Sequence, residues 1–161
     1  YGKMGTEDER LVWWNPKDAN NKDGGYQQEK FKFSDIQTWM GDYVWMRIEE
    51  MYLIAAEASV RLNKGDAAKY INVLRTRAGA GTVSESQVDL NYIFDEYARE
   101  LCGECARWYL LKRNAAFETR LAAYNKRAAE HFKKEFYLRP IPTKYLDAIN
   151  NPAEFGQNAG Y

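Results

Sequence analysis

Residues 46–79 read MRIEEMYLIAAEASVRLNKGDAAKYINVLRTRAG and predict two antiparallel helices joined by a tight turn. In the first half, apolar residues recur at helical spacing and form one stripe, composed of Ile48, Met51, Tyr52, Ala55, Ala58 and Leu62. The small residues in this stripe would let a neighbouring helix approach closely. Gly65 can take the left-handed conformation that ends a helix, and Asp66 is a candidate N-cap for the next one. The stretch therefore predicts a helical hairpin, which is a scaffold and carries no chemistry by itself.

The hairpin has about the size of a tetratricopeptide unit, and further helical patterns follow it. One helix is expected to run through Leu90 to about Arg113, and another from about Ala115 to Lys134. Two caps are possible for the first: Ser84, which fits a capping box with Gln87, and Asp89. The fold expected is mainly α, with tetratricopeptide-like helical hairpins and irregular, loop-rich segments at both ends. We expect one domain over 1–161, divided into an irregular aromatic-rich segment (1–45), a helical scaffold (46–134) and an extended C-terminal segment (135–161).

Charge and composition exclude some classes of function. Lys and Arg together number 23, as do Asp and Glu, and this balance argues against a nucleic-acid-binding protein. No run of about 18 apolar residues is present, so the sequence predicts no membrane-spanning helix. The chain opens at Tyr1 without a signal peptide or an initiator Met, and we therefore expect a piece of a larger protein.

The two cysteines and a row of glutamates invite chemical interpretations that the pattern does not favour. Cys102 and Cys105 form a C-x-x-C inside a helical pattern, where two small packing residues are the better interpretation. Glu96, Glu100 and Glu104 could be catalytic carboxylates, but carboxylates interleaved with arginines on one helix usually form a solvated or salt-bridged face. The single His131 is remote in sequence from the cysteines, and in its basic, polar stretch an exposed helix residue is the better interpretation than a metal ligand. No metal site and no cofactor are expected.

Aromatic residues flank a polar, turn-rich stretch near the N-terminus. Trp13 and Trp14 precede the stretch 17–25, and Tyr26 follows it. Rings on loops could form a platform on which sugar rings stack, or they could fasten an irregular segment to the helices. Trp13, Trp14 and Tyr26 are our candidate ligand-binding residues. For the rings that lead into the first helix the packing interpretation is favoured, and these are Trp39, Tyr43 and Trp45.

Several stretches, taken together and in order, resemble the SusD/RagB family of surface glycan-binding lipoproteins from Bacteroidetes. Residues 46–58 resemble the characteristic helix of the family, and residues 70–79 resemble the segment that follows it. Residues 99–113, RELCGECARWYLLKR, are similar to a family helix in which Asp is usual at the position of Leu110. The stretches YLRPIP (137–142) and QNAGY (157–161) resemble the terminal signatures of the family.

The resemblance implies the C-terminal portion of a larger, non-enzymatic SusD-like protein. It implies a cell-outer-membrane location at the surface, with an N-terminal lipid anchor that is absent from this chain. It also implies an oligosaccharide or polysaccharide ligand and a SusC-like TonB-dependent transporter as partner. The alternative is a helical protein–protein interaction module in which this fragment makes no direct glycan contact.

Overall fold

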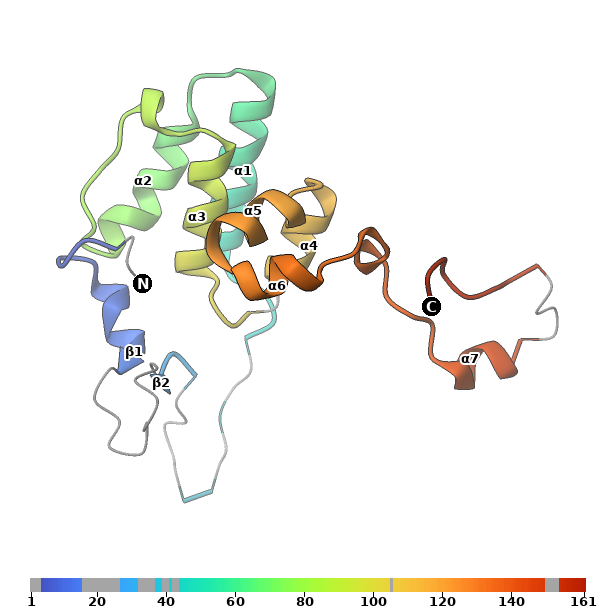
Figure 1. Cartoon of the computed structure of the whole chain (residues 1–161). Helices are drawn as coiled ribbons and strands as arrows, with labels where there is room; N and C mark the ends of the chain where they lie inside the picture. Colours follow the sequence, from blue (N-terminus) through green and yellow to red (C-terminus); the bar gives the residue numbers. More distant parts are fainter. Residues whose placement is uncertain are drawn as a thin grey trace. The chain divides into compact units, whose positions relative to one another are not determined.

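The computed structural model describes residues 4–15, 27–31, 37–38, 41, 44–104, 106–149 and 154–161. Within these ranges the chain is mainly helical, with seven α-helices and one pair of two-residue strands (Figure 1). Internal contacts divide it into two compact units, Tyr1–Arg107 and Trp108–Tyr161, and the boundary falls inside helix α4. The first unit contains the predicted hairpin, and the second contains the C-terminal segment.

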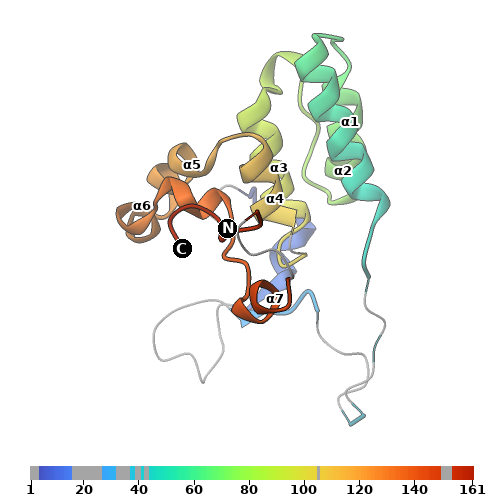
Figure 2. The ribbon, with the colours of Figure 1, turned by 90° about the vertical axis from the view of Figure 1, so that its right-hand side faces the viewer.

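Helices α1 (Ile48–Leu62) and α2 (Ala67–Arg77) form the predicted hairpin. Figures 1 and 2 both show them side by side. Helix α1 ends at Asn63, which adopts the left-handed conformation and donates its N–H to Ser59 and Val60 carbonyls. Gly65 is also left-handed, with φ +74°, as the sequence predicts. The short connection 63–66 makes the two helices antiparallel neighbours.

The face of α1 that packs inside the unit is not the predicted apolar stripe. The buried residues of α1 are Leu53, Ala56, Glu57 and Ser59. Ile48, Met51, Ala58 and Leu62, which belong to the predicted stripe, are exposed. On α2 the buried residues are Ala67, Ala68, Ile71 and Leu74. Helix α1 therefore carries apolar residues on two sides, and periodicity alone did not identify the side that packs.

The N-terminus of α2 is capped by a residue distant in sequence. Asp66 occupies the N-cap position, but its carboxylate accepts a hydrogen bond from the Ser59 hydroxyl instead of from the helix. The Glu85 carboxylate accepts from the N–H groups of Ala67 and Ala68, at 3.1 and 2.7 Å. Glu85 opens the 3-10 turn η2 (Glu85–Gln87). Because these two N–H groups lack partners within the helix, this contact ties η2 to the start of α2.

The expected long helix from Leu90 to Arg113 is interrupted. Helix α3 (Leu90–Glu100) begins at Asp89, whose carboxylate caps the Tyr92 N–H at 2.7 Å as predicted, and α4 covers Ala106–Arg113. Gly103, between the two helices, has φ +79°, and a Cβ at this position would lie 2.5 Å from the Phe31 ring. A left-handed residue cannot continue a right-handed helix, so the chain turns here.

The N-terminal part of the first unit is built from short elements. The 3-10 helix η1 (Glu9–Trp13) begins at Asp8 and continues into strand β1 (Trp14–Asn15), which pairs antiparallel with β2 (Gln27–Gln28). The Glu9 N–H donates to the carbonyl of Ala78 at the end of α2, at 2.9 Å. This hydrogen bond fastens η1 to the helical hairpin.

The second unit also differs from the single helix expected over 115–134. Helix α5 (Phe117–Tyr124) ends at Asn125, and the Asn125 side chain caps the next helix, α6 (Lys126–His131), at the Ala128 N–H. The 3-10 turn η3 (Lys134–Tyr137) and a short helix α7 (Thr143–Asp147) follow. Aromatic rings hold this unit together, with the Phe117 ring 5.1 Å from Tyr137 and 5.5 Å from Phe132.

The C-terminal residues pack back onto the extended stretch 138–142. The Gln157 side chain accepts from the Ile141 N–H and donates to the Ile141 carbonyl, at 2.7 and 2.8 Å. The Asn158 side chain donates to the Arg139 carbonyl, and the Tyr161 hydroxyl donates to the Leu138 carbonyl. These side chains satisfy backbone groups that have no strand partner, and so the irregular tail is ordered.

Candidate functional site

A buried guanidinium holds η1 against helix α3. Arg10 donates to Asp8 through Nε and Nη2, both at 2.8 Å, and its Nη1 reaches Glu96 at 2.7 Å and Glu100 at 3.1 Å. All four side chains are buried. Burial raises the pKa of Asp8, but hydrogen bonds and charge attraction from Arg10 outweigh it and leave that pKa below its ordinary value. The segment before Trp13 is thereby anchored by charge-assisted hydrogen bonds.

A second group of charges closes the C-terminal end of α3. Arg47 donates to Glu104 Oε2 through Nε at 2.9 Å and to the Glu100 carbonyl at 3.1 Å, while Lys30 donates to the Glu100 carbonyl and pairs with Glu104. Burial lowers the pKa of Lys30 in spite of this pairing. Burial raises the pKa of Glu104, but bonds from Arg47 and Lys30 more than offset this, and the pKa is lowered. Both cations satisfy carbonyls at the helix end.

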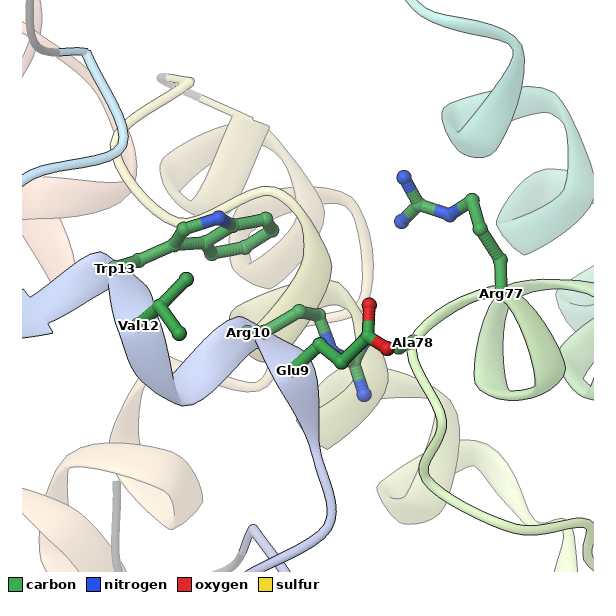
Figure 3. Close-up of a pocket in the computed structure, with 6 residues that line it drawn as sticks. All are labelled: Glu9, Arg10, Val12, Trp13, Arg77 and Ala78. Atoms are coloured by element: carbon green, nitrogen blue, oxygen red, sulfur yellow. The ribbon is translucent and has the colours of Figure 1, made fainter.

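A pocket of about 430 Å³ opens between η1 and the end of α2 (Figure 3). Six residues line it, namely Glu9, Arg10, Val12, Trp13, Arg77 and Ala78. Trp13 and Val12 line the η1 side, and Arg77 extends from α2 on the other side. Arg77 also pairs with Glu100 at 2.6 Å and with Glu49 at 3.2 Å, so its guanidinium is held in place at the pocket.

The Trp13 ring belongs to a small aromatic surface around Lys30. The Lys30 ammonium lies 4.3 Å from the centroid of the Trp13 ring and 5.7 Å from that of Phe31, which places both rings around one cation. Phe31 is 49% exposed, and its ring rests against Gly103. Trp13 is partly buried and lines the pocket. One of the three predicted ligand-binding residues therefore lies at a cavity.

The other two candidates are placed differently. Trp14 is partly buried in β1 and does not line the pocket, and its Nε1 has no hydrogen-bond partner among the described residues. Tyr26 lies outside the described residues, as do Trp39 and Tyr43. The stretch 17–25, predicted to be a surface loop, is also outside them.

The packing interpretation of Trp45 is wrong. The Trp45 side chain is 86% exposed, just before helix α1 begins. Nothing in the sequence signals this, because a ring that leads into an amphipathic helix resembles a residue that packs under it. Trp45 thus adds an exposed ring to the first unit.

The glutamates expected on a solvated or salt-bridged face are ion-paired, and two of the three are shielded from solvent. Glu96 and Glu100 have no exposed surface, and each pairs with at least two arginines. Carboxylates held in this way have no free oxygen facing a pocket in which to act as acid or base. Their role is to bind the arginines that join η1, α1 and α2 to α3.

Other chemical possibilities find no support in the described part of the chain. Cys102 is a free, partly buried thiol in the turn after α3, and burial raises its pKa, which makes it less reactive. Cys105 is not described. Within the described ranges, no group of three or more His, Cys, Asp or Glu residues is placed to hold a metal ion. Among the described helices, none combines the length and the hydrophobicity that crossing a bilayer requires.

The arrangement at the pocket suits a neutral polar ligand with an apolar face. An indole ring can stack against such a face, while the Glu9 carboxylate accepts and the Arg77 guanidinium donates hydrogen bonds. The sequence did not point to Glu9 or Arg77, which line this pocket. They are far apart in the chain, and neither belongs to a motif, so only the docking of η1 on α2 brings them together.

Comparison with known proteins places the chain in a family. Residues 12–161 match the sequence profile of the SusD family. The SusD-like protein P2 of Formosa agariphila is 31% identical over 133 residues, which cover 74% of this chain and 26% of that protein. The crystal structure of a SusD-like carbohydrate binding protein from Bacteroides vulgatus aligns with a TM-score of 0.57 and 33% identity, over 69% of this chain and 25% of that one. The matched region thus spans about a quarter of each relative. The chain belongs to the SusD family, whose carbohydrate-binding members are not enzymes.

Proposed function

We propose that this chain is the C-terminal portion of a larger SusD-like protein that binds oligosaccharide at the bacterial cell surface. The full-length protein is held at the outer membrane by an N-terminal lipid anchor and passes its ligand to a SusC-like TonB-dependent transporter. The α1–α2 hairpin is a tetratricopeptide-like unit of its scaffold. Family membership supports this proposal, together with the similarity to the Bacteroides vulgatus relative, a SusD-like carbohydrate binding protein.

The Trp13 pocket is the proposed contact with the sugar. The observation that carries this step is that Trp13, an aromatic residue chosen from the sequence, lines a cavity together with a carboxylate and a guanidinium. A pyranose presents C–H groups on its faces and hydroxyls around its edge, so one ring can stack on Trp13 while Glu9 and Arg77 bind its hydroxyls. No bond is made or broken.

The test is a calorimetric titration of the purified protein against a panel of polysaccharides. Trp13→Ala should weaken binding by about tenfold or more, equivalent to about 1.4 kcal/mol. Tyr145→Ala removes a ring that is 64% exposed in the second unit and should leave the affinity unchanged. Trp14→Ala and Tyr26→Ala test the two other candidates in the same way. Equal affinity of Trp13→Ala and the unchanged protein would remove Trp13 from the site.

The transporter partnership is tested separately. The full-length protein should co-purify with the transporter encoded beside it, and Trp13→Ala should retain this interaction because it changes only the sugar contact. If the protein captures the transporter but binds no polysaccharide of the panel, the chain is a helical interaction module without glycan contacts.

A further inference from the structure

The Lys30 ammonium contacts both the end of helix α3 and the ring of Trp13. Its side chain is only 9% exposed. It donates to the Glu100 carbonyl at 2.6 Å and to the Cys102 carbonyl at 3.4 Å, and it pairs with the Glu104 carboxylate. An ammonium group has three N–H donors, and these three acceptors can satisfy all of them. The end of α3 and the turn that follows it therefore fix the position of the charge.

The pairing of β1 with β2 brings Lys30 to Trp13. Trp14, the first residue of β1, lies opposite Gln28 of β2. Next to this pair, the Glu29 N–H donates to the Trp13 carbonyl at 2.7 Å. Lys30 follows Glu29, and its ammonium lies over the Trp13 ring, 4.3 Å from the centroid. This distance is well within the range of about 6 Å in which the face of an aromatic ring attracts a cation.

The ion pair with Glu104 does not by itself account for this placement. The Glu104 carboxylate also accepts two hydrogen bonds from Arg47, at 2.9 and 2.8 Å. Burial lowers the pKa of Lys30, so the surroundings disfavour the charged form of this side chain. What Lys30 supplies beyond the shared ion pair is a fixed cation against the Trp13 ring.

The ammonium occupies one face of the indole, and the pocket lies on another side of the ring. Trp13 lines the pocket together with five other residues, which Figure 3 shows, and Lys30 is not among them. A ligand in the pocket therefore meets the ring where the ammonium does not cover it. We infer that Lys30 is a positioning residue for ligand binding, which fixes the orientation of the Trp13 ring and leaves one face free to stack on a single sugar ring. This inference rests on the proposed function.

The first measurement concerns the ring alone and needs no sugar. Hydroxyl-radical labelling of the purified protein, read by peptide mass spectrometry, gives the oxidation rate of Trp13. In Lys30→Leu this rate should rise by about threefold or more, because the ring is released from the cation and exposes both faces. Lys30→Arg keeps a cation and should retain the slow rate. Lys69→Leu is the matched control and should not change the rate, since Lys69 also lies near an aromatic ring, that of Tyr70, but is exposed.

The second measurement is a double-mutant cycle on a polysaccharide that the unchanged protein binds. Lys30→Leu should weaken binding by about threefold or more, and Lys30→Arg should retain most of the affinity. In the Trp13→Ala background, Lys30→Leu should cause no further loss, because its effect passes through the ring. Circular dichroism checks the fold of each variant. If Lys30→Leu loses helical signal, Lys30→Gln replaces it, since an amide still donates to the two carbonyls but carries no charge.

An unchanged oxidation rate of Trp13 in Lys30→Leu overturns the inference, as do losses of affinity that add up in the double variant. The labelling does not involve sugar, so the orientation of the ring is decided whatever the titrations show. Full affinity of Trp13→Ala would overturn the proposed sugar contact itself. Reduced affinity of Trp13→Ala together with full affinity of Lys30→Leu would overturn only the role of Lys30.

Discussion

Arg10 is the residue on which the position of Trp13 depends most. Its guanidinium is buried and contacts three carboxylates, on Asp8, Glu96 and Glu100. Asp8 belongs to the same local segment, whereas the two glutamates lie on α3. The contact therefore joins the short helix that carries Trp13 to the helical part of the unit through one side chain.

Arg10→Met should destabilise the first unit strongly. The substitution takes away the arginine that pairs with the buried Asp8 and one of the arginines that pair with each of Glu96 and Glu100. Breaking a buried ion pair typically costs about 3–5 kcal/mol. Urea unfolding followed by circular dichroism measures the free energy of unfolding. Arg127→Met, at an exposed position of α6, is the control and should change it by less than about 0.5 kcal/mol. A loss for Arg10→Met as small as that of the control would show that the buried network contributes no net stability.

Acid should weaken the contact between Glu104, in the turn after α3, and the residues before α1. The pKa of Glu104 is below its ordinary value of 4.5 in the folded protein, so the unfolded chain binds a proton more readily than the folded one. The stabilisation is therefore complete above about pH 4.5 and is lost as the pH falls through the lower, folded-state pKa. Asp8, whose ordinary value is 3.8, acts in the same direction.

The measurement is the free energy of unfolding in urea between pH 6 and pH 3, a range set by the ordinary carboxyl pKa values of about 4. Glu104→Gln cannot ionise and should show a shallower decrease than the unchanged protein. Glu130→Gln, at an exposed position of α6, should not alter the slope. If the free energy of unfolding of Glu104→Gln fell with pH as steeply as that of the unchanged protein, the assignment of this acid sensitivity to Glu104 would be wrong.

At the scale of elements, the turn between α3 and α4 depends on a single glycine. Gly103 has φ +79°, and a methyl group there would meet the Phe31 ring. Gly65, in the hairpin turn, has φ +74° but open space around it. The two positions share a backbone conformation and differ in what surrounds them.

Gly103→Ala should cost more stability than Gly65→Ala. The left-handed conformation costs a residue with a side chain about 1–2 kcal/mol, and this part is common to both variants. Displacing the Phe31 ring adds a second cost at position 103, of about 1 kcal/mol or more. Thermal unfolding of the two variants side by side measures the difference. Equal losses would mean that the half-exposed ring moves away freely.

Helix boundaries show where sequence patterns are insufficient. The hairpin, the Asp89 cap and the end of α2 before Gly79 could be predicted, because each depends on residues close in the chain. The breaks at Gly103 and Asn125 were missed, because the apolar spacing continues across both. The capping of α2 by Glu85 could not be anticipated either. Glu85 lies 18 positions from Ala67 and 17 from Ala68, the two residues whose N–H groups it caps.

At the scale of the whole molecule, the protein should bind glycans without cleaving them. The glutamates that resemble a catalytic set are neutralised by arginines, and Glu96 and Glu100 are shielded from solvent. Prolonged incubation with each polysaccharide that it binds should release no new reducing ends. Product formation that disappears in Glu104→Gln, the least buried of the three, would contradict this expectation.

The sequence by itself determined the helical class of the chain, the hairpin and the family, because local spacing and ordered motifs carry that information. It also picked out Trp13 as a candidate, a choice that remains a prediction until binding is measured. Only the tertiary structure decided which side of α1 packs, that Glu96 and Glu100 are buried partners of Arg10, and that Glu9, Trp13 and Arg77 line one pocket. These features arise from contacts between residues far apart in the chain. The spacing of apolar residues along a helix is the same whether the face that they form packs against a neighbour or is exposed to solvent.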